Sequence, residues 1–405
     1  MLARRAWKRW LSGAVRAFAV AFAALVLFAP ARASAYPWMI RHGYSGCTPC
    51  HSDPSGSGPL TSYGRAIGAG LLTTPLGPKT SDSPASAGFL FGLVPTPDWL
   101  ELGGDVREAV LRVKTPGAPE LRRSILMQAD LSATVTVGHV IASGTGGYAH
   151  EGALGAAVTR GDKDNFVSRE HWLGYSFGDE SPLLLRAGRM NLPFGIRSVE
   201  HTLWARAVTR TNINDQQQYG LALAWTTGAL RGEVMAIAGN YQLRPDDYRE
   251  RGYSADLELS VSTPLALGVS SLVTHRSLDT TTLKPAWRQV HGVHARYLTP
   301  WQPLVLLSEW DYTLVSSKDQ PWRKGIVGYA QADLEAAQGV HFLVTGEAQN
   351  VGTHGPPPSW GLWLSYNWFL LPHSDIRIDG IYQSFGSDFG RLSAYTLLLQ
   401  GHVYL

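Results

Sequence analysis

Cysteine is almost absent from this chain of 405 residues. The only two, Cys47 and Cys50, lie three positions apart in the stretch C-T-P-C-H at residues 47–51. A fold held together by several disulfides is therefore excluded. Any thiol chemistry is confined to this one short segment.

Long apolar runs are missing after residue 35. From Trp99 onward, no stretch is long and apolar enough for a membrane helix, and none shows a sustained 3.6-residue apolar stripe. The one apolar run begins at Ala17, follows a basic head and ends at the small residues Ala33 and Ala35. This order predicts a cleavable signal peptide over residues 1–35, with an N-terminal anchor helix as the alternative.

A strong positive charge is also missing once the signal peptide is set aside. The chain has 35 Lys and Arg against 32 Asp and Glu, and six of the basic residues but none of the acidic ones lie in residues 1–35. The exported chain is thus slightly acidic, which gives no support to nucleic-acid binding.

The two thiols are followed directly by His51, and C-x-x-C-H is the attachment signature of c-type haem. In this chemistry both thiols form covalent bonds to the porphyrin and the histidine binds the iron. All three side chains lie on one short helical turn. A disulfide, a redox dithiol or half of a zinc site are the alternatives. We predict one covalent haem c on Cys47 and Cys50, with His51 as an axial ligand.

The second axial ligand is predicted to be His42, since bis-histidine ligation needs only a short chain reversal from the haem motif. Met39, a histidine elsewhere in the chain, or an open coordination position are alternatives.

The segment that carries the motif, residues 36–72, is too short to bury a haem by itself. It is followed by a Pro-, Ser- and Gly-rich linker, which we place at residues 73–98. The haem segment must therefore dock on the remainder of the chain.

Residues 99–405 are predicted to form a 16-stranded transmembrane β-barrel, an all-β fold. Segments of about ten residues alternate apolar and polar side chains. They begin near residues 100, 121, 138, 166, 182, 216, 229, 251, 265, 287, 302, 323, 339, 359, 374 and 391. Tight turns follow the even segments and longer loops follow most odd ones, which is typical of a membrane barrel with both termini in the periplasm and is not predicted by a β-sandwich. The haem segment is expected to plug the barrel or dock on it.

The chain resembles the fused monohaem cytochrome–porins of the bacterial outer membrane, whose studied members oxidise extracellular ferrous iron. The matching residues are Arg41, Cys47, Cys50, His51, Pro59, Leu60, Gly64 and Arg65. Extra Gly and Ser residues before Pro59, and a terminal Leu405 in place of an aromatic residue, depart from the family pattern. The resemblance implies an outer-membrane electron-transfer protein of the iron:cytochrome c oxidoreductase type, with periplasmic cytochromes and an extracellular donor or acceptor as partners.

Three functions remain open. The protein is predicted to be an electron conduit across the outer membrane. A diffusion porin with a structural or regulatory haem segment is the main alternative, and a haem enzyme such as a peroxidase is a third.

Two further groups of polar residues follow from the strand pattern. Residues 188–206 are either a loop folded into the lumen, with Arg189, Arg197 or His201 near the haem propionates, or a surface loop. Arg65 is likewise either near the haem or on the surface.

Polar side chains of three neighbouring segments are expected to form an acid-rich wall that attracts cations: Glu309, Asp311, Gln331, Asp333, Glu335, His341 and Glu347.

Overall fold

The computed structural model describes residues 37–42, 44, 47–75, 88–149, 165–178, 182–198, 200, 202–213, 216–243, 246–279, 282–301, 303–318, 320–350, 352, 357–388 and 390–405. The predicted signal peptide, part of the linker and His201 lie outside these residues. Among the described helices, none is long and apolar enough to cross a membrane.

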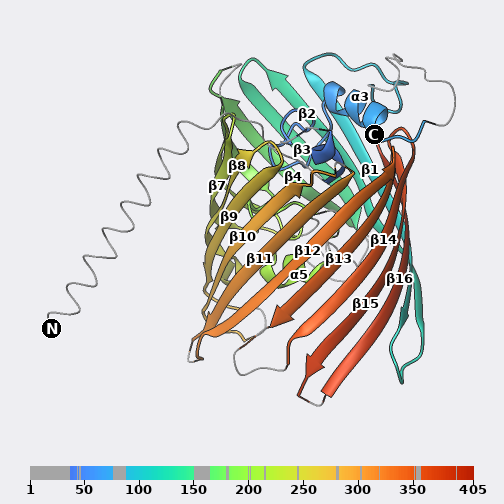
Figure 1. Cartoon of the computed structure of the whole chain (residues 1–405). Coiled ribbons are helices and arrows are strands. Elements are labelled where there is room, and N and C mark those ends of the chain that lie inside the picture. Colours follow the sequence, from blue (N-terminus) through green and yellow to red (C-terminus); the bar gives the residue numbers. More distant parts are fainter. Residues whose placement is uncertain are drawn as a thin grey trace.

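Sixteen antiparallel strands form one closed barrel, in which β1 pairs with β16 (Figure 1). The strands are β1 (Leu100–Lys114), β2 (Leu121–Val137), β3 (Val140–Ala149), β4 (Asn165–Ser176), β5 (Leu183–Met190), β6 (Gln218–Thr226), β7 (Leu230–Gly239), β8 (Arg251–Ser262), β9 (Leu265–Arg276), β10 (Ala286–Leu298), β11 (Leu304–Ser317), β12 (Arg323–Ala337), β13 (Val340–Asn350), β14 (Ser359–Leu371), β15 (Ser374–Ser387) and β16 (Gly390–Tyr404). Every strand begins within two residues of its predicted start, so the predicted barrel is confirmed.

Side chains alternate between the two faces of the wall. On β14, the side chains of Trp360, Leu362 and Leu364 are exposed on the outside. Those of Trp363, Ser365 and Asn367, which alternate with them, are buried on the inside. Several of the tryptophans near strand ends are also exposed, namely Trp99, Trp287, Trp301, Trp322 and Trp360. An apolar outer face with aromatic residues near the strand ends is the surface that a bilayer requires.

The connections differ in length between the two ends of the barrel. Two-residue turns at 138–139, 263–264, 338–339 and 372–373 lie at the end that also carries α3 and the C-terminus (Figure 1). Longer connections, such as 240–250 with η2 (Asp246–Tyr248) and 277–285, lie at the opposite end. We call these the short-turn end and the long-loop end.

The predicted haem segment lies inside the short-turn end. It contains α2 (Pro37–Arg41), the C-T-P-C-H turn and α3 (Ser62–Leu71) (Figure 1). α2 packs against β11 and β12. The predicted docking on the barrel is thus confirmed, and we refer to residues 37–75 as the plug.

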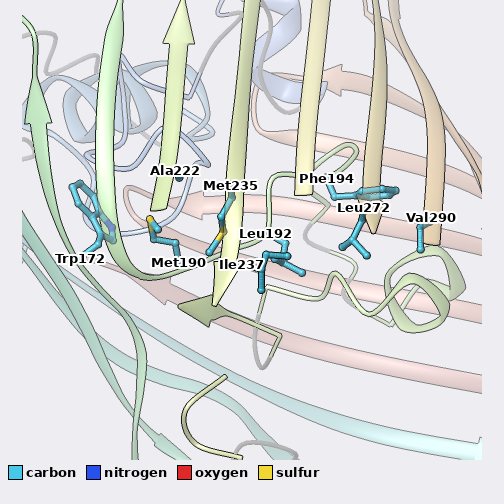
Figure 2. Close-up of a cluster of buried hydrophobic side chains, with 9 residues drawn as sticks. All are labelled: Trp172, Met190, Leu192, Phe194, Ala222, Met235, Ile237, Leu272 and Val290. Atoms are coloured by element: carbon cyan, nitrogen blue, oxygen red, sulfur yellow. The ribbon is translucent and has the colours of Figure 1, made fainter. Parts of the chain in front are cut away.

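A second segment occupies the lumen. The connection from β5 to β6, residues 191–217, folds inward and carries α5 (Trp204–Thr209), which contacts β11, β12 and β13. Figure 2 shows its Leu192 and Phe194 among apolar side chains that point inward from the wall, including Met235, Leu272 and Val290. Of the two interpretations of residues 188–206, the luminal loop is therefore correct.

Candidate functional site

The C-T-P-C-H stretch forms a helical turn. The amides of Cys50 and His51 both donate to the carbonyl oxygen of Cys47, at 3.1 and 2.8 Å. Neither cysteine is in a disulfide. Two free thiols and a histidine on one turn are the arrangement that covalent haem attachment requires.

A cavity of about 290 Å³ opens beside this turn. Cys47, Cys50 and His51 line it on the plug side, together with Met39, and strands β1, β2 and β14–β16 line it on the barrel side. Its volume is near the lower end of the range for small-molecule sites, about 300 Å³. The motif therefore faces a cavity that the plug and the barrel wall line together.

The electrostatics of the turn suit a metal ligand. Burial lowers the pKa of His51, because the charged imidazolium would lose its hydration. The Nδ1 atom of His51 is buried without a hydrogen-bond partner among the described residues. The neutral imidazole is the form that binds iron, and burial also raises the pKa of the Cys50 thiol. The donor set fits a c-type haem.

Glycine lets helix α3 approach the haem motif closely. A Cβ atom on Gly64 would lie 2.3 Å from the carbonyl oxygen of Cys50, so no larger residue fits without movement of the backbone. The amide of Thr61 donates to the same carbonyl oxygen at 2.9 Å, and its hydroxyl caps the helix by accepting from the Gly64 amide. The helix thereby holds the C-T-P-C-H turn in place.

Arg65 anchors the plug and does not line the cavity. Its guanidinium donates to the carbonyl oxygens of Leu60 and Leu102 at 2.8 and 2.7 Å, and to Glu101 at 2.7 Å. Arg65 is fully buried. The Gly64–Arg65 pair on which the family resemblance rests therefore joins the haem turn to the start of β1.

A buried charge cluster fixes the plug deeper in the barrel. Arg186 on β5 bonds both Asp53 of the plug and Glu233 on β7, and its guanidinium lies 5.1 Å from the ring centre of Trp172. The Asp53 and Arg186 side chains are completely buried. Close by, the Ser57 hydroxyl donates to Glu170 on β4.

His42 lies beside the barrel wall and is not among the residues that line the cavity. Its Nε2 atom is 3.6 Å from a carboxylate oxygen of Glu335, which also binds Arg41. Burial lowers the pKa of His42, although the Glu335 carboxylate opposes this shift. Met39, the alternative ligand, does line the cavity. The ligand role of His42 stays a prediction, and the position of Met39 makes the thioether the better-placed donor.

The predicted propionate partners lie away from the cavity. Arg189 donates to the carbonyl oxygen of Arg169, and Arg197 donates to that of Leu192. Two other arginines, Arg107 on β1 and Arg377 on β15, line the cavity instead. Arg377 is buried on the inward face of β15, and only the docked plug shows that this face borders the C-T-P-C-H turn.

The acid-rich wall faces inward as expected, on the neighbouring strands β11, β12 and β13. However, most of its carboxylates are bonded to the chain itself. Glu309 binds Arg206 and the Ile196 amide, and Glu347 accepts from the Trp204 amide. Asp333 is 3.0 Å from His341, and Glu335 binds the plug. Only Asp311, among the five carboxylates of this wall, lacks a hydrogen-bond partner for either oxygen in the described structure. The inward direction of the wall is therefore confirmed, whereas its attraction for cations stays a prediction, because Glu309, Glu335 and Glu347 hold the plug and the luminal loop.

Comparison with known proteins rests on structure alone. No protein-family profile and no curated protein sequence matches the chain. Outer-membrane expressed OmpT of Vibrio cholerae superimposes with a TM-score of 0.57 at 10% identity, over 77% of this chain and 100% of that chain. The anion-selective porin from Comamonas acidovorans gives 0.55 at 11% identity, over 76% and 99%. The outer membrane channel DcaP of Acinetobacter baumannii gives 0.53 at 10% identity, over 76% and 97%.

The fold is that of outer-membrane porins. At such low identity the comparison shows a shared barrel fold. It does not indicate that this chain transports the same solutes. In this chain the N-terminal segment enters the lumen and brings the C-T-P-C-H turn with it.

The buried cluster predicts how firmly the plug is held. Replacing Asp53 with alanine leaves Arg186 short of one buried partner, and should destabilise the docked plug by about 3 kcal/mol. Protease cleavage within residues 47–75 of the folded barrel should then be faster. Asp246→Ala removes an exposed carboxylate from its pairs with Arg249 and Arg251, and should leave the docking of the plug unchanged, because exposed ion pairs contribute little to stability. Equal cleavage rates for the two variants would contradict the anchoring role.

The position of Met39 predicts the outcome of ligand substitutions. Met39→Ala should change the reduced absorption spectrum and lower the reduction potential, because thioether ligation raises the potential of haem iron. His42→Ala should leave the spectrum unchanged, since its side chain is directed at Glu335. A changed spectrum for His42→Ala with an unchanged spectrum for Met39→Ala would instead identify His42 as the second axial ligand.

Proposed function

We propose that this protein is an outer-membrane electron conduit, in which a covalent c-type haem sits within the plugged end of a porin-like barrel. The observation that carries the proposal is the helical C-T-P-C-H turn, with free thiols and a histidine whose Nδ1 atom is buried, that opens into a cavity lined by the plug and the barrel wall. The likeness to outer-membrane barrels supports the location.

Bound haem c would supply reversible one-electron transfer at its iron. The residues of the chain have separate roles around it. Cys47 and Cys50 form the covalent links, His51 provides an axial nitrogen, and Gly64 allows α3 to support the turn. The barrel wall lines the site with Arg107 on β1 and Arg377 on β15, of which Arg377 is paired with Glu200 and Asp379.

The topology indicates which end of the barrel would meet each redox partner. Both the plug and the C-terminus lie at the short-turn end, which in barrels of this kind faces the periplasm. A periplasmic cytochrome would meet the protein at that end. The donor or acceptor outside the cell, of which ferrous iron is the one that the family resemblance implies, would meet the long-loop end.

A diffusion porin is the second candidate, favoured by the likeness to porins. The two segments inside the lumen argue against a wide pore. The plug and the luminal loop both form ion pairs with buried charges on the wall. If either segment left the lumen, these wall charges would lose their partners.

The two functions are separated by one experiment on proteoliposomes that contain the purified protein, an enclosed impermeant electron acceptor and an enclosed small fluorescent solute. When an impermeant reductant is added outside, a conduit should reduce the acceptor while the solute is retained. A porin should release the solute.

The double variant Cys47→Ala, Cys50→Ala is the control. It should abolish reduction of the acceptor if the proposal is correct, because the thiols no longer hold the haem. Solute release at the same rate in both proteins, with no reduction of the acceptor in either, would establish the porin instead.

A further inference from the structure

Three polar side chains in the cavity lining have no role in the haem attachment described above. Asp105 lies near the start of β1, Asp375 near the start of β15 and His402 near the end of β16, all towards the short-turn end. All three line the cavity opposite the C-T-P-C-H turn. We call them the acid–histidine triad.

The imidazole of His402 lies between the two carboxylates of the triad. Its Nδ1 atom is 2.9 Å from an oxygen of Asp375, and its Nε2 atom is 3.2 Å from an oxygen of Asp105. Each of these hydrogen bonds needs one hydrogen atom between nitrogen and oxygen. A neutral imidazole carries one N–H group, and an ionised carboxylate carries no hydrogen. The triad therefore holds two protons, in the simplest case as an imidazolium between two ionised carboxylates.

Loss of one of these protons would disturb the triad. One ring nitrogen would then present a lone pair to a carboxylate oxygen, and that hydrogen bond would be lost. The net charge of the triad would change from one negative charge to two. The triad is thus a site whose charge depends on a single proton.

The neighbouring strands add few further charges. Arg107 lies opposite His402 in the register of β1 and β16, and it opposes positive charge on the ring. Tyr404 packs against His402 with ring centres 5.3 Å apart, and His373 packs against Tyr404 at 5.5 Å. Arg377, the next inward residue on β15, is already paired with two carboxylates. The carboxylates of the triad are therefore the groups that favour the imidazolium.

The second strand and the plug complete the surroundings. On β2, Asp130 lies opposite Asp105 and is paired with Arg169. From the plug, His51 and the two thiols of the motif line the same cavity. The charge of the triad and the proposed haem therefore share one cavity.

Protons can reach the triad. The side chain of Asp105 is 35% exposed, and those of Asp375 and His402 are 15% and 14% exposed. The triad is thus only partly buried, so it can exchange a proton with water.

We propose that the triad binds a proton when haem c in the cavity is reduced and releases it when the haem is oxidised. The inference rests on the proposed function, because it needs a haem beside the triad. One electron comes from the redox partner and one proton comes from water, and no bond to the iron forms or breaks. Since charges inside a protein are weakly screened, the added electron and the added proton stabilise each other.

The reduction potential of the purified full chain, measured by haem absorbance over about pH 5 to 9, tests this coupling. The potential should fall as the pH rises, because loss of the proton leaves a negative charge that disfavours the electron. The limit is a tenfold change in the ratio of reduced to oxidised haem for each pH unit, which equals about 59 mV for one electron.

His402→Gln should remove most of this pH dependence, because glutamine does not titrate. The matched control is His294→Gln. His294 is a buried histidine near two carboxylates, Asp256 and Glu258, at 3.8 and 3.7 Å, but it does not line the cavity. This variant should keep the native slope.

Deuterium exchange at the ring carbon between the two nitrogens of His402, read by mass spectrometry of its peptide, reports protonation directly. The midpoint pH of this exchange should be higher in the reduced protein than in the oxidised protein, because the coupling is reciprocal. Asp375→Asn should lower the midpoint, since one negative charge beside the ring is lost.

A potential that does not vary with pH would overturn the proposal. A slope that persists in His402→Gln, or a His402 midpoint that is equal in the two redox states, would overturn it as well. These results would leave the proposed function intact. A purified chain without haem absorbance would instead overturn the proposed function, and the coupling with it.

Discussion

The guanidinium of Arg186 lies fully buried within the barrel, and carboxylates from two distant parts of the chain neutralise it. Asp53 comes from the plug and Glu233 from the wall. A buried cation that loses a partner destabilises a protein by several kcal/mol, so the plug is not an optional attachment to a finished barrel. Asp53 is only a few residues from Cys50 and His51, and the same ion pair therefore sets where the haem motif lies. The other anchors, Arg65 with Glu101 and Arg41 with Glu335, hold the two sides of the plug to the rim.

The polar side chains of the barrel interior serve to hold the two inserted segments. In an open porin, the inward charges of the wall are free to interact with passing solutes. Here Glu309 and Glu347 bond the luminal loop, and Glu335 bonds the plug. The apolar contacts of Leu192 and Phe194 with the wall then become possible inside the lumen, where solvated charges would otherwise be expected (Figure 2). The cavity beside His51 lies between the two inserted segments and the wall.

The sequence predicted the barrel well, because two-residue alternation is a local property and the depth of a bilayer limits strand length. Strand number, strand starts and the alternation of short and long connections could all be obtained in this way. The helical turn of C-T-P-C-H was predictable because the spacing of its residues is also a local property. Pairings across the lumen were not, since Asp53 and Arg186 are separated by 133 positions and nothing in their local sequence marks them as partners. The position of His42 depends likewise on Glu335, almost three hundred residues away, and its proximity in sequence to Cys47 did not indicate that contact.

The central claim is that Cys47 and Cys50 together hold one haem inside the barrel. It is tested most directly by intact-mass measurement of the purified protein from a host that attaches c-type haem, followed by peptide mapping. The account predicts a mass equal to the processed polypeptide plus one haem, with the added mass located on the peptide that contains both cysteines and His51. A processed polypeptide of unmodified mass, or a disulfide between Cys47 and Cys50, would contradict it.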